Sequence, residues 1–157
     1  MEYLLPAWAP NLHPLMVHFP IAILIAATIA DFAGIIWPRP WLRKAVLGLF
    51  IFGVPMLLLT YLSGEQAIDV VEVPLKGQMV ASNHANWALN TLIFYGLYLV
   101  VRLVLNYTGY AKRKWVAIIL LLAGLAGIGF IAKTADLGGQ LVYEHGVGVQ
   151  QESNKDF

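Results

Sequence analysis

The sequence predicts an all-α membrane protein, a polytopic four-helix bundle whose helices run up and down in turn. Three observations support this prediction: four long apolar segments, a scarcity of charged residues and an uneven distribution of lysine and arginine. Of the 157 residues, 59% are hydrophobic and 12% are charged, and the mean hydropathy is +0.70. A soluble domain carries about 25% charged residues. The deficit of charge therefore indicates a lipid environment.

The four apolar segments are each long enough to cross a membrane, which takes roughly 20 helical residues. They cover about residues 14–37, 42–63, 84–106 and 115–135. A membrane span must satisfy its own backbone hydrogen bonds, and none of the segments alternates as a barrel strand does, so we expect helices. The loops within the first pair and the second pair of segments are short, which favours antiparallel neighbours. We find no internal repeat in the sequence.

The basic residues predict the orientation of the bundle. Seven of the ten fall on one side of the predicted membrane, namely Arg39, Arg43, Lys44, Arg102, Lys112, Arg113 and Lys114. Eight of the nine acidic residues fall on the other side, with both termini and the loop 64–83. The positive-inside rule then places both termini and the loop 64–83 on the outer side of the membrane. We expect one transmembrane domain over residues 1–149, followed by a polar tail over 150–157.

The composition also excludes several kinds of chemistry. The chain has no cysteine, which rules out disulfides, thiolate metal sites, iron–sulfur clusters and covalent attachment of haem through C-x-x-C-H. The net charge of +1 provides no basic surface for nucleic acid. Any metal site must therefore use histidine, carboxylate, methionine or backbone oxygen.

The four histidines are the main chemical signal. His13 and His18 open the first apolar segment, His84 opens the third, and His145 follows the fourth, so all four are expected near the outer face. Neutral imidazole is the commonest metal ligand and a usual axial ligand of haem iron. A four-helix bundle can supply such ligands from both sides of the macrocycle. The alternative is that each histidine contacts lipid headgroups or caps a helix.

The spacing of the histidines suggests which of them would bind. His13 and His18 are five residues apart, which separates them by roughly 140° on an ideal helix, so they cannot both face one ion. His18 lies deeper in the segment, and we expect His18 and His84 to be the axial ligands of a haem iron. His13 and His145 would then ligate a second haem or contact the propionates.

The end of the fourth segment is rich in glycine. Gly138 and Gly139 are expected to end the helix, as glycine commonly does. The apolar and glycine-rich residues that follow predict an extended segment, which folds over the outer end of the bundle and brings His145 toward the other histidines.

Other polar residues have structural interpretations. We expect Asp31 to contact one of three arginines near the inner face, Arg39, Arg43 or Arg102. Lys133 and Asp136, three residues apart, are expected to pair with each other. Glu65, at the outer end of the second segment, could accept a hydrogen bond from a histidine N–H.

Two strings of the chain resemble a bacterial membrane family catalogued as domain of unknown function 2231. They are NLHPLMVHFPIA at residues 11–22 and LGGQLVYEHGVGV at residues 137–149. With a histidine that opens the third helix, they match the family's pattern in order over nearly the whole chain. The matching positions are His13, Pro14, His18, Pro20, His84, Gly138, Gly139, Tyr143, His145 and Gly146. The resemblance implies a four-helix membrane domain, sometimes found with cytochrome c domains, and implies no established activity.

These observations lead to a functional hypothesis. The chain is expected to be a membrane protein that binds haem b through two histidines near the periplasmic face and transfers electrons. A quinone or a periplasmic cytochrome c would be the partner, and no catalytic residue is expected, because the pattern is more typical of an electron-transfer protein or subunit than of a stand-alone enzyme. Two alternatives stay open: binding or transport of Zn, Cu or Fe by the histidines, and a structural anchor subunit of a membrane redox complex. Either a homo-oligomer or such a complex is compatible with the sequence.

Overall fold

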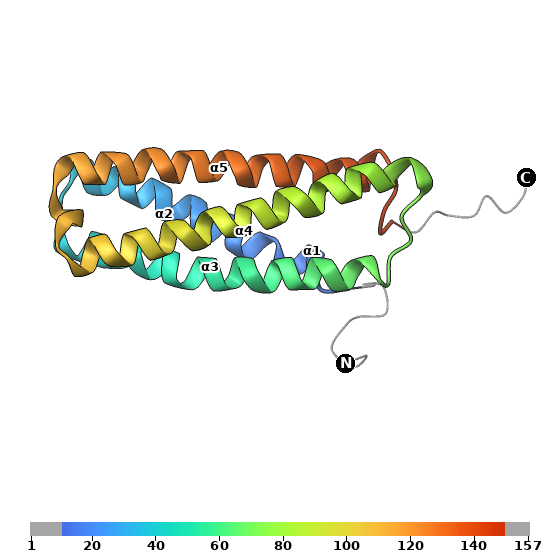
Figure 1. The fold of residues 1–157 in the computed structure, drawn as a ribbon, viewed down its shortest axis with the longest axis horizontal. Helices are drawn as coiled ribbons and strands as arrows, with labels where there is room; N and C mark the ends of the chain where they lie inside the picture. The colour runs from blue at the N-terminus through green and yellow to red at the C-terminus, as the bar shows by residue number, and fades with distance from the viewer. Residues whose placement is uncertain (1–10, 150–157) are drawn as a thin grey trace, which may run out of the picture.

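A computed structural model describes residues 11–149, which form a bundle of four long helices (Figure 1). The first is divided into α1 (His13–Met16) and α2 (His18–Ile36); the others are α3 (Pro40–Ile68), α4 (Gln78–Tyr107) and α5 (Lys114–Tyr143). Two short 3₁₀ helices, η2 (Leu75–Gly77) and η3 (Tyr110–Lys112), precede α4 and α5. In length and composition all four long helices are able to cross a membrane. The predicted all-α bundle is confirmed, and the predicted tail over 150–157 lies outside the described residues.

Three of the helices, α3, α4 and α5, are longer than the apolar segments that predict them. At the end of the bundle that carries the histidines, α3 continues to Ile68, α4 already begins at Gln78, and α5 continues to Tyr143. The prediction that Gly138 and Gly139 end the last helix is wrong, because both lie inside α5. The predicted extended segment is accordingly reduced to residues 144–149, which form turns with Gly146 and Gly148 at φ of 67° and 76°.

Each helix packs on two neighbours around a shared core. α2 lies against α3 and α5, and α4 lies against the same two helices, so α2 and α4 are diagonal partners. Large apolar side chains on the outer faces of all four helices stay exposed, among them Phe32, Phe52, Leu97 and Leu122. An apolar exterior of this kind suits lipid as the surrounding solvent.

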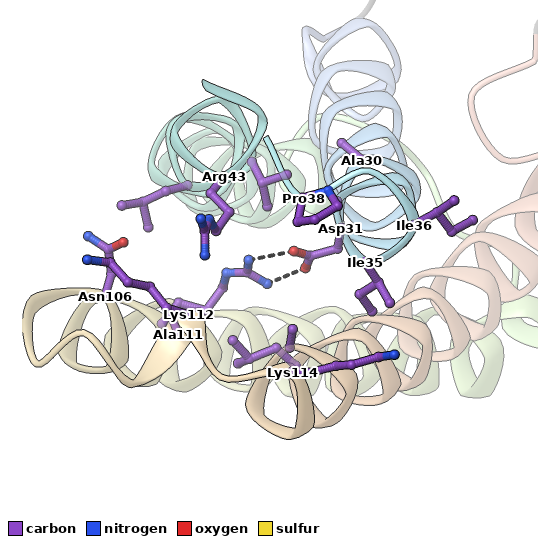
Figure 2. Close-up of a pocket in the computed structure, with 16 residues that line it drawn as sticks. Ala30, Asp31, Ile35, Ile36, Pro38, Arg43, Asn106, Ala111, Lys112 and Lys114 are labelled. Carbon is purple, nitrogen blue, oxygen red and sulfur yellow. Dashed lines mark hydrogen bonds and ion pairs between the residues drawn. The ribbon is translucent and has the colours of Figure 1, made fainter. Parts of the chain in front are cut away.

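A buried ion pair joins the diagonal helices α2 and α4 (Figure 2). Nη2 of Arg102 donates to Oδ1 of Asp31 at 2.8 Å, and Nη1 donates to the second carboxylate oxygen. Nη1 also lies 2.6 Å from the Tyr98 hydroxyl, and the guanidinium stands 4.5 Å above the Phe50 ring centre. The expected contact between Asp31 and one of the arginines is confirmed, with Arg102 as the partner. We call this end of the bundle, with Arg43, Lys112 and Lys114, the basic end.

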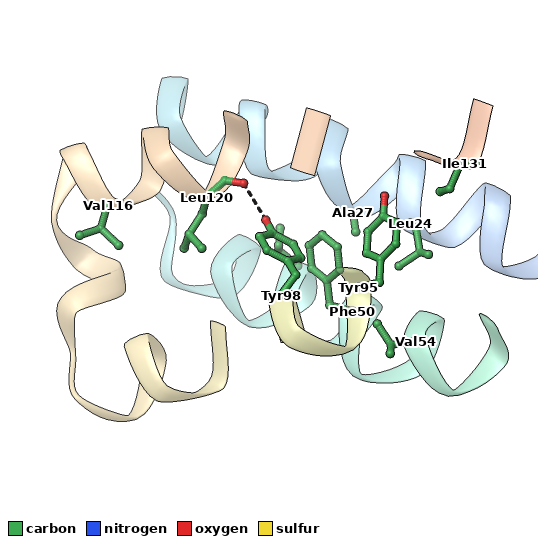
Figure 3. Packing of buried hydrophobic residues seen from close by; sticks show 10 residues of the cluster. Leu24, Ala27, Phe50, Val54, Tyr95, Tyr98, Val116, Leu120 and Ile131 are labelled. Atoms are coloured by element: carbon green, nitrogen blue, oxygen red, sulfur yellow. Dashed lines mark hydrogen bonds between the residues drawn. The ribbon is translucent and has the colours of Figure 1, made fainter. Parts of the chain in front are cut away.

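Aromatic side chains fill the middle of the core (Figure 3). The rings of Phe50 and Tyr98 meet edge to face with centres 5.1 Å apart, and Phe50 and Tyr95 stack at 6.5 Å. The Tyr98 hydroxyl donates to the Leu120 carbonyl oxygen at 2.7 Å. Edge-to-face and offset contacts are the arrangements that aromatic rings favour. This core lies between the ion pair at one end of the bundle and the histidines at the other.

The break between α1 and α2 is caused by Pro20. Proline has no N–H to donate to the carbonyl four residues earlier, which is that of Met16. The Thr60 hydroxyl of α3 lies 3.2 Å from the Met16 carbonyl oxygen and 2.9 Å from that of Met56, so its one hydrogen is shared between the two acceptors. A neighbouring helix thus satisfies the carbonyl that the proline leaves free, as a membrane interior requires. The same contact ties α1, and with it His13, to α3.

Candidate functional site

The structure brings His13 and His84 together at one end of the bundle, which we call the histidine end. Their ring centres are 6.4 Å apart and their planes are at 82°. His13 is the first residue of α1, and His84 lies in the second turn of α4, so the two rings approach from diagonal helices. Both side chains are half-buried.

Hydrogen bonds fix the tautomer of both rings. Nδ1 of His13 lies 3.1 Å from the Thr60 carbonyl oxygen and 3.1 Å from the Ser63 hydroxyl oxygen. The Ser63 hydroxyl donates its own hydrogen to the Thr60 carbonyl at 2.7 Å, so both oxygens are acceptors for the ring. Nδ1 of His84 lies 2.9 Å from the Thr134 carbonyl oxygen. Because a carbonyl oxygen only accepts, each Nδ1 carries the hydrogen and each Nε2 keeps its lone pair.

The two Nε2 atoms are therefore available as ligands. Within residues 11–149, neither accepts a hydrogen bond from another residue. A histidine that binds a metal commonly donates its other ring N–H to a carbonyl or carboxylate, which orients the ring and raises its basicity. His13 and His84 both have this arrangement. The expected partner Glu65 does not take part; its side chain is exposed, and backbone carbonyls take the N–H groups instead.

Glycines make room for both rings. A Cβ at Gly64 would lie 3.0 Å from Cε1 of His13, and a Cβ at Gly138 would lie 3.1 Å from Cε1 of His84. Each glycine follows, by four residues, the threonine whose carbonyl binds that histidine. One turn of helix therefore supplies both the acceptor and the space, in α3 and again in α5. Gly138 therefore leaves space for the His84 ring and does not end the helix.

The separation of the rings suits one metal ion between them. A bond from a metal to an imidazole nitrogen is about 2 Å long, and the ring centre lies about 1 Å farther on. Two imidazoles on opposite sides of one ion therefore have ring centres about 6 Å apart, close to the 6.4 Å observed. Rotation about the bond to the metal leaves the ligation unchanged, so planes at 82° are compatible with it. Among the described residues there is no group of three or more His, Cys, Asp or Glu side chains that could hold a metal.

The other two histidines lie elsewhere. His18, which the sequence favours as a ligand, is exposed on α2 and is not part of the ring pair. His145 lies in the turn after α5 and packs on Gly77, where a Cβ would be 3.2 Å from the Cβ of His145. His13 replaces His18 opposite His84 because His13 lies on the buried stripe of its helix. Residues 7, 11 and 14 positions later on that stripe are buried: Pro20, Leu24 and Ala27. This stripe is the signal that sequence reasoning missed.

The same stripe recurs in α4. The residues 7, 11 and 14 positions after His84 are also buried: Thr91, Tyr95 and Tyr98. Asp31 and Arg102, the members of the ion pair, each lie 18 residues after their histidine. Eighteen residues make five helical turns, so the histidine and the charged residue share one face in each helix. The sequence shows no repeat because only the pattern of buried positions, and few residue identities, recurs.

The pattern also recurs in the partner helices, α3 in the first hairpin and α5 in the second. Thr60 and Gly64 in α3 correspond to Thr134 and Gly138 in α5. The hydroxyl of Thr60 contacts the carbonyl that Pro20 frees. Thr91 is the counterpart of Pro20, seven residues after its histidine, and its hydroxyl lies 2.9 Å from that of Thr134. The bundle is thus two similar helical hairpins, and each hairpin contributes one histidine to the site.

One expected contact at this end of α5 is confirmed: Nζ of Lys133 lies 2.8 Å from Oδ2 of Asp136. Both side chains are exposed, so the pair contributes little to stability.

Comparison with known proteins agrees with the motifs. No curated protein and no solved structure matches the chain. A family model described as predicted membrane protein, DUF2231, matches residues 9–151, which include both histidine strings and all four membrane spans. The chain is thus a multi-pass membrane protein and belongs to the DUF2231 family.

Proposed function

We propose that the protein binds one haem b at the histidine end, with His13 and His84 as axial ligands, and that it transfers electrons. The observation that carries the proposal is the pair of imidazoles at 6.4 Å, each with Nδ1 bonded to a carbonyl and with Nε2 unbonded within residues 11–149. A four-helix bundle is a common host for such a site.

The number of ligands favours haem over a bare ion. A protein-bound zinc ion usually has four ligands, or three and a water. In the described part of the chain, the two rings have no third metal-binding side chain grouped with them. Two ligands on opposite sides suit an iron whose other four positions are filled by a macrocycle. Bound haem supplies a one-electron couple, and the protein contributes the axial ligands and their hydrogen bonds.

The distribution of charge supports an orientation. The basic end carries Arg43, Lys112 and Lys114, and the positive-inside rule places such an end in the cytoplasm. The histidine end would then face the periplasm of a bacterial inner membrane. A periplasmic cytochrome c or a membrane quinone would be the redox partner at that face.

The test is an absorption spectrum of protein purified from haem-replete cells. We expect a Soret band and a pyridine haemochrome of the b type. His13→Ala and His84→Ala should each lose most of the bound haem. His18→Ala and His145→Ala are matched controls and should keep it.

Three outcomes would overturn the proposal. A colourless protein that takes up no added haemin would exclude haem, and elemental analysis would then show whether Zn, Cu or Fe is bound in its place. Loss of haem in His18→Ala but not in His13→Ala would mean that His18, and not His13, ligates the iron. Full haem content in all four variants would mean that the histidines are structural, as in an anchor subunit.

A further inference from the structure

A second site lies at the opposite end of the protein. There the helices enclose a cavity of about 360 Å³ beside the ion pair of Asp31 and Arg102. Arg43, Lys112 and Lys114 also line it, and the Arg43 side chain extends into the space beside the ion pair (Figure 2). The cavity is separate from the histidine pair, since Asp31 and Arg102 each lie five helical turns from their histidine.

The cavity has an excess of positive charge. Four cationic side chains line it, and Asp31 is the one acidic residue among them. The Asp31 carboxylate is already occupied, because both of its oxygens accept hydrogen bonds from Arg102. Within residues 11–149, Arg43, Lys112 and Lys114 form no ion pair. Three cations beside one cavity are thus left without a counter-ion from the described chain.

The depth of the cavity matches the lipid headgroups. Three tryptophans at the same end are exposed, Trp37, Trp41 and Trp115. Tryptophan with this exposure gathers at the boundary between headgroups and acyl chains. The rest of the lining is largely apolar and includes Ile35, Leu47 and Leu120. A ligand with an anionic head and an apolar tail complements both parts of this lining.

We propose that this cavity binds the phosphodiester headgroup of an anionic phospholipid from the leaflet at the basic end. Basic pockets between membrane helices commonly bind such headgroups. Arg43, Lys112 and Lys114 supply the positive charge that attracts the phosphate, while Arg102 stays paired with Asp31. The site does not depend on the histidine pair.

The test compares two triple variants with the same change of charge. Arg43→Gln with Lys112→Gln and Lys114→Gln removes the free cations of the cavity. Arg39→Gln with Lys44→Gln and Arg113→Gln removes three cations of the same end that do not line the cavity. Binding of phosphatidylglycerol and of phosphatidylcholine to the detergent-solubilised full chain is measured by native mass spectrometry. Each cation that lies beside a bound anionic headgroup contributes roughly fivefold in affinity, so the cavity variant should bind phosphatidylglycerol about a hundredfold more weakly.

The control variant should lose less than about threefold, because salt screens charges outside the cavity. A melting curve checks that each variant is folded, and Arg43→Gln against Lys44→Gln repeats the comparison with one charge if a triple variant unfolds. Equal losses in cavity and control variants would overturn the proposal, as would equal affinity for phosphatidylcholine. Complete displacement of the lipid by millimolar inorganic phosphate would also overturn it, because the natural ligand would then be a soluble anion.

Discussion

Gly138 and Gly139 are neighbours in α5, but only Gly138 packs against another helix. A Cβ at Gly138 would meet the His84 ring at 3.1 Å, whereas a Cβ at Gly139 would have no atom within 4 Å outside its own helix. Adjacent glycines thus have different roles, and only the first is required by the site.

We predict that Gly138→Ala weakens cofactor binding while Gly139→Ala does not. The added methyl group must displace the His84 ring, and with it the bond from Nδ1 to the Thr134 carbonyl. Overpacking of this kind costs about 1–3 kcal/mol. Gly139→Ala should instead stabilise the helix by roughly 0.5–1 kcal/mol, because alanine loses less entropy than glycine on folding. Haem content and thermal melting of the two variants provide the measurement, and identical behaviour would mean that the ring is not held against Gly138.

The identity of the inward-facing histidine could have been predicted from the sequence. The angle between His13 and His18 correctly shows that only one of them faces the core. Depth in the membrane is a poor guide to which one, since it ignores the face of the helix. Adding Leu24, Ala27 and Asp31 to one helical stripe selects His13. The acceptors Thr60 and Thr134 could not be found in this way, because a carbonyl is present at every residue and only packing selects one.

At the scale of the helix, the junction between α1 and α2 depends on a hydroxyl of α3. Pro20 leaves the Met16 carbonyl without its usual partner, and Thr60 replaces that partner. The same residue provides the carbonyl for His13. Thr60 therefore couples the shape of the first helix to the position of its histidine.

We predict that Thr60→Val destabilises the protein by about 1 kcal/mol, the usual net value of one hydrogen bond. In a Pro20→Ala background the loss should be smaller, because the alanine introduced there has an N–H to donate to the Met16 carbonyl. Thr60→Ser, which keeps the hydroxyl, is the matched control. Thermal melting of the parent protein, the two single variants and the double variant forms a double-mutant cycle, and an equal cost of Thr60→Val in both backgrounds would contradict this account.

The helix lengths show what hydropathy can and cannot predict. The apolar segments gave the number of helices and their ends at the basic end within a few residues. At the histidine end, α3, α4 and α5 extend one to two turns beyond them. Hydropathy detects the part of a helix that lipid surrounds, and the extensions contain polar residues such as Glu65, Ser82 and Asp136. The histidine pair lies at the border of that more polar part, since His84 begins its apolar segment and His13 directly precedes its own, so its geometry was the least predictable from composition.

For the molecule as a whole, the repeated hairpin relates the two ends of the bundle. His13 and His84 are identical at corresponding positions, whereas Asp31 and Arg102 have opposite charge. The repeat could not be predicted from the sequence, because the corresponding core positions differ as much as Leu24 and Tyr95. The corresponding positions can be identified only from their burial in the structure.

We predict that Asp31 and Arg102 can be exchanged. Either Asp31→Ala or Arg102→Ala should destabilise the protein by roughly 3–5 kcal/mol, because the remaining charge is buried without a partner. The double variant Asp31→Arg with Arg102→Asp should be markedly more stable than either single variant, since the two positions correspond in the repeat. Thermal melting in detergent tests this, and an exchange variant no more stable than the single variants would show that Tyr98 and Phe50 fix the arginine to α4.

The division of the ion pair between hairpins has a consequence for how the chain is made. During synthesis the first hairpin leaves the ribosome with Asp31 and without its counter-ion, which is 71 residues farther along the chain. Until α4 arrives, the Asp31 carboxylate lacks the hydrogen bonds that Arg102 donates to both of its oxygens, and a buried charge without its partner is destabilising. Arrival of α4 neutralises the carboxylate and delivers the second histidine in the same helix. Completion of the buried ion pair and pairing of the two imidazole rings therefore both depend on the arrival of α4.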